Sequence, residues 1–567
     1  MKKYLSRFLV LMLVCCLTLC GCGTGASNED GSQKNQTAAE EKSNSDSNAD
    51  SSQQGDYHSN INPPGEYPVC KEKITMKVGI VQDSNVEDYE TNFLTKLYEE
   101  KTNMDLVFDV YSNIEAEQKL QVMVASQSDL PEIITGIKLS DLTILSFGEQ
   151  GAIIPLNDLI DKYGHNIKNA YENSPQLKTY TTMPDGKIYS IAKYTETIGN
   201  LWSGRATINK KWLDKVGMEI PKTTDELYEA LKAFKAQDPN GNNKADEIPL
   251  LGNLKGWRQK VYDFIFNAYI YNDTSDRYIV KDGKLSFAYN TPQWREALRF
   301  MNKLCTEGLL SPQSFTINED QFKQIVRAEP DLTVGVIPAG AIILSAGDER
   351  VAEYEVIPPL TGPEGVSWAT YFPSMPENKF IITNACKNPE AAIRWADLMY
   401  DPDIVITQRW GEKGVNWDDP APGDVSLYQD TLGYPAKIKI LNDVFGSVQN
   451  VNWREGNPTY RTADYTCGQV WDGNPIYHEY LISKHMMAYK DRGPEEYVAK
   501  LIFTNEEMAE IRESKTSINE YVNESIARFI TGDLDVDKDW DSYLAELENM
   551  NIKRYQEISQ QAYDRIQ

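Results

Sequence analysis

The chain has 567 residues, which is enough for two or three domains with separate cores. It carries 84 acidic against 57 basic residues, a formal net charge of −27. A surface this acidic repels nucleic acids and anionic membranes, so we exclude direct binding to either.

The first residues predict export. Lys2, Lys3 and Arg7 precede an apolar run from Phe8 to Leu19, which is too short to span a bilayer stably and is typical of a secretory signal. The following Leu19-Cys20-Gly21-Cys22 resembles the lipobox of bacterial lipoproteins. That resemblance implies that residues 1–21 are a lipoprotein signal peptide and that Cys22 becomes a diacylated (palmitate-type) N-terminus. The alternative is an ordinary cleaved signal with an incidental cysteine.

Residues 22–65 are predicted to form a disordered tether. They are Ser, Asn, Gln, Asp, Glu, Lys and Gly with very few apolar side chains, and such a segment cannot bury enough surface to offset its ordering entropy. We therefore expect a globular body held at the cell membrane by its lipid anchor, on the extracytoplasmic face.

The body begins near Cys70 with a strand, a helix and a strand. Apolar residues alternate over 74–80 and 104–110, the period expected of strands, and repeat at helical spacing over 89–97. A helix around 120–123 and a short strand over 131–134 follow, which favours an α/β sheet.

A second unit begins near Trp202. Thr223 and Glu226 are spaced as a helix-capping box, and amphipathic helices are predicted from Trp540 to the C-terminus. The cysteines of the body lie far apart and form no zinc motif, the histidines show no metal-ligand spacing, and one disulfide is possible but cannot be assigned; the cysteines are Cys70, Cys305, Cys386 and Cys467.

Several segments together resemble the bacterial extracellular solute-binding proteins of family 1, the sugar-binding lipoproteins of ABC transporters. They are Asp129-Leu-Pro-Glu-Ile-Ile134, Gly151–Ile160, Asp185–Tyr189, Trp212–Gly217 with Pro221–Leu227, Lys387–Ala392 and Ile518–Tyr521. The resemblance implies an α/β fold of two lobes, the periplasmic-binding-protein fold of type 2, with a hinge and an interlobe cleft. We expect lobe one at 70–200 and 370–415, and lobe two at 201–369 and 416–567.

The segment Asp238–Glu247 predicts a calcium loop. It places oxygen-bearing side chains at alternate positions around a glycine, as in an EF-hand loop, although the glutamate comes early. In the family that this chain resembles, such a loop holds structural Ca²⁺. The ligands carried over from it are Asp238, Asn240, Asn242, the Lys244 carbonyl, Asp246 and Glu247. The alternative is a polar turn that ends a helix.

Tryptophans in polar loops are the candidate ligand residues, because aromatic rings stack on the apolar faces of sugars. Those at amphipathic helical spacing (Trp212, Trp294, Trp395 and Trp540) are expected in the core. The favoured set is Trp202, Trp257, Trp368, Tyr371 and Trp453, with Arg454 as a polar partner.

We interpret the chain as a monomeric binding protein that captures a carbohydrate, expected to be an oligosaccharide, by hinged closure and delivers it to the transmembrane subunits of an ABC permease. Two alternatives are a secreted polysaccharide hydrolase and a lipoprotein that senses a solute without transport. Because no GxSxG, HExxH or phosphate-binding loop is present, we favour the binding protein over an enzyme.

Overall fold

The structure, a computed structural model, describes residues 58–112, 115–444, 447–454 and 456–567. Cys22, the signal peptide and most of the tether lie outside the described residues. Within them, no helix has the length and apolar character that crossing a membrane requires.

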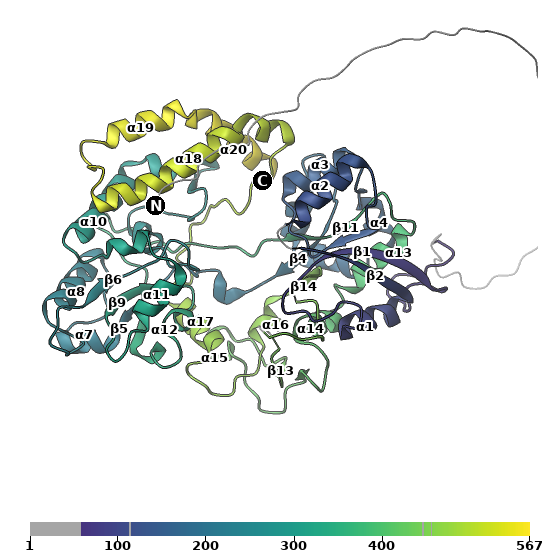
Figure 1. Cartoon of the computed structure of the whole chain (residues 1–567), viewed down its shortest axis with the longest axis horizontal. Helices are drawn as coiled ribbons and strands as arrows, with labels where there is room; N and C mark the ends of the chain where they lie inside the picture. The colour runs from purple at the N-terminus through teal and green to yellow at the C-terminus, as the bar shows by residue number, and fades with distance from the viewer. Residues whose placement is uncertain (1–57, 113–114, 445–446, 455) are drawn as a thin grey trace, which may run out of the picture. The chain divides into compact units, whose positions relative to one another are not determined.

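Lobe one is built on a six-stranded mixed sheet in the order β14-β4-β11-β3-β1-β2 (Figure 1). Its strands are β1 (Ile74–Val81), β2 (Met104–Tyr111), β3 (Ile133–Thr135), β4 (Ile191–Thr195), β11 (Glu377–Ile382) and β14 (Thr459–Arg461). The alternating residues of β1 and β2 pair in parallel from Ile74–Met104 to Val81–Tyr111, as their period of two predicts. β11 runs antiparallel between β3 and β4.

Helices cover this sheet, and apolar clusters fill both of its faces. The helices of lobe one are α1 (Phe93–Thr102), α2 (Ala116–Ser126), α3 (Asp141–Glu149), α4 (Asn157–Tyr163), α5 (Asn166–Asn173), α6 (Pro175–Thr181), α13 (Pro389–Leu398), α14 (Pro402–Trp410) and α16 (Ala463–Cys467). α1 begins after Asn92, whose side chain accepts the Leu94 N–H, so Tyr89 is buried but precedes the helix.

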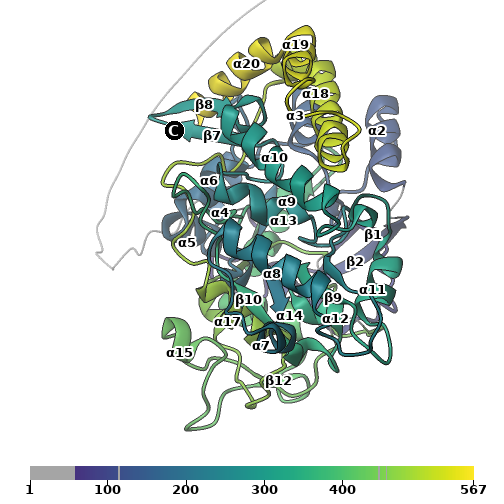
Figure 2. The same ribbon diagram turned by 90° about the vertical axis from the view of Figure 1, so that its left-hand side faces the viewer.

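Lobe two contains a four-stranded sheet in the order β10-β5-β9-β6 and most of the remaining helices. Its strands are β5 (Ala206–Asn209), β6 (Ile248–Leu250), β9 (Val334–Pro338) and β10 (Tyr354–Ile357), with the hairpin β7 (Tyr278–Lys281) and β8 (Lys284–Phe287). Its helices are α7 (Lys210–Val216), α8 (Thr224–Ala236), α9 (Val261–Ile265), α10 (Pro292–Thr306), α11 (Glu319–Val326), α12 (Ile342–Ala346), α17 (His478–Met487), α18 (Asn505–Thr531), α19 (Trp540–Asn549) and α20 (Ile552–Arg565). Figures 1 and 2 both place α18 beside α10. The segment between α14 and β14 carries the short α15 (Gln429–Leu432) and the pair β12 (Trp417–Asp418) and β13 (Lys439–Ile440).

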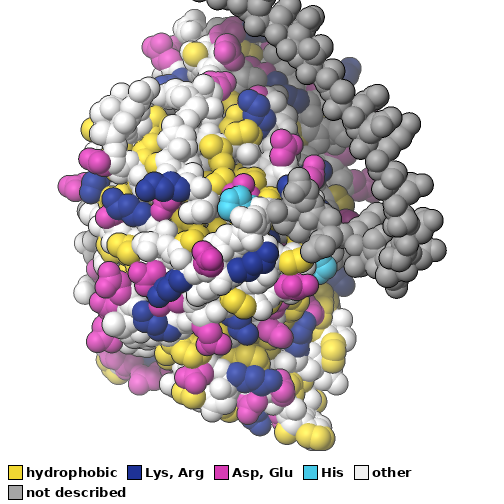
Figure 3. Space-filling model, turned by 90° about the vertical axis from the view of Figure 1, so that its right-hand side faces the viewer, with side chains coloured by type: hydrophobic (Ala, Val, Ile, Leu, Met, Phe, Trp, Pro, Cys, Tyr) yellow, Lys and Arg dark blue, Asp and Glu magenta, His cyan; other side chains and the backbone are white. Residues whose placement is uncertain are grey.

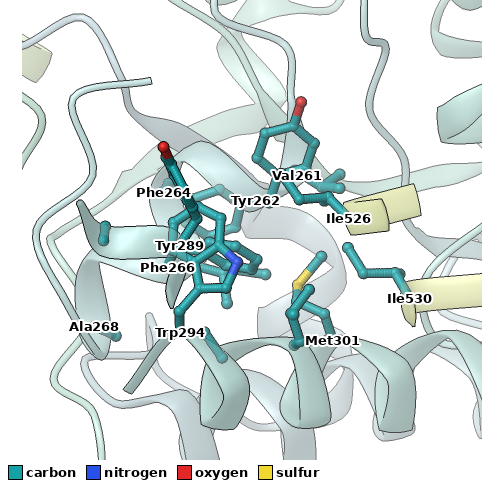
Figure 4. Close-up of a cluster of buried hydrophobic side chains, with 14 of the residues drawn as sticks. Val261, Tyr262, Phe264, Phe266, Ala268, Tyr289, Trp294, Met301, Ile526 and Ile530 are labelled. Atoms are coloured by element: carbon teal, nitrogen blue, oxygen red, sulfur yellow. The ribbon is translucent and has the colours of Figure 1, made fainter. Parts of the chain in front are cut away.

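The largest core lies in lobe two. Figure 4 shows residues of α9 and α10 facing Ile526 and Ile530 of α18, and the Phe266 and Trp294 rings meet edge to face at 4.4 Å. The predicted capping box of α8 is present, since Glu226 N–H donates to Thr223 Oγ1 at 3.1 Å. The four tryptophans expected in the core are all buried, at 0–5 % exposure.

Two segments lie elsewhere than the sequence suggested. Residues 58–65, assigned to the tether, pack on lobe one: Ile61 is 3 % exposed, and the Arg394 guanidinium donates to the Pro63 carbonyl. Residues 459–461, assigned to lobe two, form β14 and pair in parallel with β4 of the six-stranded sheet. Such long-range pairing is invisible to local sequence patterns, so the boundary at 416 was wrong for this strand.

Candidate functional site

The chain crosses between the two sheets several times. Residues 196–205 lead from β4 to β5, residues 358–376 lead from β10 back to β11, and a third connection leaves β14 and reaches α17 and residues 488–493. Backbone hydrogen bonds of 2.8 Å join these crossings, from Phe372 N to the Leu201 carbonyl and from Ala369 N to the Arg492 carbonyl. Residues on these crossings are therefore neighbours although they are far apart in sequence.

Arg205 fastens the first and third crossings together. Its side chain is 1 % exposed and donates to the Ile482 carbonyl at 3.0 Å and to the Gly199 carbonyl at 2.9 Å. Burial lowers the pKa of Arg205 to about 10, so the guanidinium stays charged at neutral pH. Breaking such a buried, charge-assisted contact is costly, which makes this end of the crossings rigid.

Half-buried aromatic side chains gather where the crossings meet. The Trp202 and Tyr371 ring centroids are 5.3 Å apart, and Tyr371 meets Tyr497 edge to face at 4.9 Å. Gly493 lies against the first pair, since a Cβ there would be 3.4 Å from Tyr371 Cβ. Trp202 Nε1 is buried and has no hydrogen-bond partner among the described residues.

Two tryptophans beside this group are exposed. Trp257 is 41 % exposed and Trp368 is 37 % exposed, far more than the core tryptophans. Trp257 packs on Gly340, where three of its ring carbons lie 2.4–2.7 Å from the position that a Cβ would take. Only glycine leaves room for this ring. Trp368 is held by its backbone, which donates to the Asn267 carbonyl at 2.9 Å.

Trp453, predicted to bind the ligand, is instead a core residue of lobe one. It is 0 % exposed, its Nε1 donates to Thr95 Oγ1 at 2.8 Å, and its ring meets Tyr98 and Phe108 edge to face at 5.3 and 5.4 Å. The polar loop around Trp453 suggested exposure, but its ring turns into the sheet. No face of it is left for a sugar, so this assignment is corrected.

Arg454 is bound to lobe one. Its side chain is 15 % exposed and its Nε lies 3.8 Å from the Asp83 carboxylate. Its backbone adopts a φ of +56°, and its N–H donates to Asn452 Oδ1 at 2.9 Å. Nothing in these contacts links Arg454 to the aromatic side chains of the crossings.

Sequence reasoning missed three residues that lie with the aromatic group: Arg258, Phe372 and Tyr497. The Arg258 guanidinium carbon lies 3.3 Å above the centre of the Phe372 ring. Phe372 follows Tyr371 directly, and Arg258 follows Trp257. Adjacency to a loop tryptophan was the signal that could have singled out Arg258.

The loop after α8 has the hydrogen bonding of a cation-binding turn. The Asp238 carboxylate accepts the backbone N–H groups of Gly241, Asn242 and Asn243 at 3.0–3.2 Å. The Asp246 carboxylate accepts the side-chain amides of Asn240 and Asn242 at 2.9–3.2 Å, and the Asn240 bond is the main cause of its lowered pKa. In this structure the amide N–H groups take the place beside the Asp246 carboxylate that a bound cation would occupy.

Glu247 gives this loop an unsatisfied oxygen. Its Oε1 is buried and has no hydrogen-bond partner in the described structure. Burial is the main cause of the raised pKa of Glu247, and the Asp238 and Asp246 carboxylates raise it further. In the described ranges, no group of three or more His, Cys, Asp or Glu side chains is arranged as a metal site. A calcium ion therefore requires the two asparagine amides to turn their oxygens inward.

The remaining cysteines are free thiols. Cys70 and Cys467 are buried, and Cys305 and Cys386 are partly buried. Burial raises the pKa of the Cys70 thiol to about 11, which keeps it protonated and unreactive.

Two sheets with separate cores, joined by crossings that carry aromatic rings, define a two-lobed α/β binding protein. Residues 83–406 match the family model "Bacterial extracellular solute-binding protein", more than half of the chain. The chain belongs to this family.

Two relatives of this chain are described as a substrate-binding protein and as a lipoprotein. The fructooligosaccharide ABC transporter substrate-binding protein FusA of Streptococcus pneumoniae is 28% identical over 519 residues, covering 88% of this chain and 92% of FusA. Lipoprotein LipO of Bacillus subtilis is 27% identical over 299 residues, covering 48% of this chain and 58% of LipO.

Solved structures show the same fold. FusA in complex with kestose matches with a TM-score of 0.68 and 27% identity, over 86% of this chain and 99% of FusA. A FusA "EF-hand mutant" with fructo-nystose matches equally, at 26% identity, a TM-score of 0.68 and the same coverage. An extracellular solute-binding protein of Bifidobacterium longum subsp. infantis shares the fold at 20% identity, with a TM-score of 0.73 over 87% of this chain and 98% of that one. The family and these relatives are binding proteins, which confirms that the chain is not an enzyme.

Proposed function

We propose that this protein is the substrate-binding component of an ABC importer and that it captures an oligosaccharide between its lobes. The observation that carries the proposal is the set of aromatic rings on and beside the crossings. Exposing Trp257 and Trp368 to water is unfavourable, so a surface that keeps them open is explained by a ligand that covers them. Sugar rings have apolar faces and hydroxyl edges that suit such a surface.

Hinged closure is the proposed mechanism. A ligand that touches side chains of both lobes and of the crossings binds the closed arrangement more tightly than the open one, and so shifts the population toward it. The permease transmembrane subunits then receive the ligand from the closed form. The FusA relative, described as a fructooligosaccharide-binding protein of an ABC transporter, supports this reading.

A structural Ca²⁺ in the loop 238–247 is part of the proposal. The donors are all oxygens, Glu247 Oε1 lacks a partner, and the FusA relative is described with an EF-hand. Asp238, Asn240, Asn242, the Lys244 carbonyl, Asp246 and Glu247 would hold the ion. Its effect would be to fix the loop after α8, because no catalytic arrangement lies beside it among the described residues.

The N-terminal residues complete the proposal. We infer a lipid anchor at Cys22 on the extracytoplasmic face, in line with the relative described as lipoprotein LipO. The formal net charge of −27 argues against binding of the body to nucleic acids. Figure 3 shows acidic and basic side chains interspersed on the face that it presents.

Mass spectrometry of the membrane fraction tests the lipid anchor and should detect a diacylglyceryl group on Cys22. Cys22→Ala should release the protein from the membrane.

Calorimetric titration of the body (residues 58–567) with neutral and acidic trisaccharides tests the proposed binding. We expect one of them to bind with a micromolar dissociation constant, and Trp257→Ala to weaken it about tenfold or more because a stacking surface is lost. Leu344→Ala, which truncates another exposed apolar side chain of lobe two, serves as the control and should leave binding unchanged. If peptides bind and no saccharide does, the carbohydrate assignment fails while the family stands.

Chelation tests the calcium. At a free Ca²⁺ concentration about 100 times the dissociation constant, the ion should stabilise the fold by about 2.7 kcal/mol, and EDTA should remove this gain. Asp246→Asn should melt at the same temperature with and without EDTA. An unchanged melting temperature of the wild type in EDTA would rule the site out.

A further inference from the structure

We propose that Arg258 fixes the orientation of the ligand by donating both terminal amines of its guanidinium group to neighbouring hydroxyls of one neutral sugar ring. This inference rests on the proposed function and adds to it the residue that hydrogen-bonds the hydroxyls at the edge of the sugar ring. Three observations carry it: how the guanidinium group is held, which of its nitrogen atoms have no hydrogen-bond partner among the described residues, and which aromatic residues adjoin it.

The guanidinium group is held by residues of two other segments. The Phe372 ring, 3.3 Å from the guanidinium carbon, fixes the plane of the group by stacking. Nε donates to Ser203 Oγ at 3.2 Å, which fixes its rotation within that plane. Phe372 and Ser203 lie on two different crossings, and Arg258 itself belongs to lobe two.

The backbone also contributes to this arrangement. Arg258 adopts a φ of +58°, a left-handed conformation that costs energy for a residue with a Cβ. Such a conformation persists when the surrounding structure determines it. With this backbone the Arg258 side chain contacts Phe372 and Ser203, while Trp257 before it packs on Gly340.

The atoms left over are the two terminal amines. No hydrogen bond joins Nη1 or Nη2 of Arg258 to any residue in the described ranges, and the side chain is only partly buried. Because Nε is directed at Ser203, Nη1 and Nη2 form the end of the guanidinium group that no described residue binds; we call this pair of donors the fork. Two parallel donors on a rigid plane match a pair of neighbouring oxygens, those of two adjacent hydroxyls or of one carboxylate, which a flexible lysine cannot do.

Asp263 is the acidic neighbour of Arg258. Burial lowers the pKa of Arg258, and the Asp263 carboxylate opposes this shift. Asp263 lies on α9, five residues along the chain, and is 4 % exposed. Lys260 and Arg277 act on this carboxylate more strongly than Arg258 does, so it balances the guanidinium charge only in part. The expectation of a neutral sugar follows from the proposed function, which draws on the relative FusA, described as fructooligosaccharide-binding.

The two neighbours of the fork supply the rest of a sugar subsite. Trp257, 41 % exposed, offers a face for stacking on one side of Arg258. The Trp202–Tyr371 pair adjoins the two residues that hold the guanidinium group, since Trp202 precedes Ser203 and Tyr371 precedes Phe372 in the chain. A hydrogen-bonding group with these aromatic residues next to it in the chain suits a ligand of at least two sugar rings.

The test uses three variants of the body: Arg258→Lys keeps the charge without the fork, Arg258→Asn tolerates the left-handed backbone and removes both, and Lys255→Gln removes one charge from an exposed residue of the same loop. Each is titrated calorimetrically with 1-kestose, maltotriose, xylotriose and trigalacturonic acid at low and high salt. Thermal melting verifies that each variant folds.

We expect the wild type to bind a neutral trisaccharide with a dissociation constant that salt hardly changes. Arg258→Lys and Arg258→Asn should both bind it about 10- to 150-fold more weakly, the range expected when one or two hydrogen bonds to a charged donor are lost. Lys255→Gln should bind as the wild type does.

Three outcomes would overturn the inference. If the wild type binds a neutral trisaccharide and Arg258→Lys binds it equally well, the fork has no role, while the proposed function stands. If trigalacturonic acid binds best and high salt weakens it, Arg258 reads a carboxylate rather than hydroxyls. If the wild type binds no saccharide, the proposed function falls and this inference with it.

Discussion

Replacing Trp453 separates a core role from a ligand role. Trp453→Ala removes a fully buried indole whose Nε1 donates to Thr95 Oγ1 and whose ring meets four other aromatic rings at 5.3–6.2 Å. Truncating a buried tryptophan typically costs about 3–5 kcal/mol. The edge-to-face contacts place this site toward the upper end of that range.

Trp453→Phe should cost less, about 1–2 kcal/mol. Phenylalanine keeps most of the apolar ring but cannot donate to Thr95 Oγ1. The Thr95 hydroxyl still donates to the Tyr89 carbonyl at 2.5 Å, so it keeps one of its two hydrogen bonds. The free energy of unfolding is measured by urea titration followed by near-ultraviolet circular dichroism, with saccharide affinity measured on the folded fraction. We expect a large loss of stability and an unchanged dissociation constant. A variant that is as stable as the wild type and binds at least tenfold more weakly would refute the core assignment.

Three further predictions follow from other parts of the molecule. Gly340→Ala should displace the Trp257 ring, because the new Cβ would lie 2.4 Å from it, and weaken saccharide binding in calorimetry; in a Trp257→Ala background it should have no further effect. Lys500→Met and Lys515→Met each remove an ion pair of 2.7 Å between partly buried groups, with Asp141 and Asp276 respectively, and should each lower the free energy of unfolding in urea by about 1 kcal/mol. Only the Lys500 pair joins the two lobes, so only Lys500→Met should change the saccharide dissociation constant. Burial raises the pKa of Asp263 from 3.8 to about 6, so the folded state keeps a proton there that the unfolded chain loses; stability should therefore fall as the pH rises from about 4 to 6, and Asp263→Asn should remove this part of the slope in scanning calorimetry. An unchanged slope in Asp263→Asn would contradict this reasoning.

Local patterns predicted local structure well. The alternation over 74–80 and 104–110 became the paired strands β1 and β2, and the capping box at Thr223 begins α8 as predicted. Amphipathic spacing correctly assigned Trp294 and Trp395 to the core, because the period of a helix states which face is buried.

Residues that depend on tertiary structure were harder to predict. β14 joins lobe one through pairing with a strand more than 260 residues earlier in the chain, and no local signal states which sheet a three-residue strand will join. Trp453 and Trp257 both stand in polar loops, yet one is 0 % and the other 41 % exposed. What separates them is the direction of the loop relative to the sheet. Arg258 depends in the same way on Phe372 and Ser203, which only the folded chain brings to it.

The segment that leads into α18 touches both lobes in alternation. Lys500 pairs with Asp141 at 2.7 Å, and Ile502 is buried in the core between β2, α2 and α3 of lobe one. Leu501 and Phe503 pack on the core of lobe two.

Successive side chains of an extended segment point to opposite sides, so one face of residues 500–503 contacts lobe one and the other face contacts lobe two. An insertion or deletion of an odd number of residues here would exchange the two faces. Deleting one residue would turn the Lys500 ammonium group toward the apolar core of lobe two, whereas a change of two residues restores the faces. Natural variation in the length of this segment should come in even steps.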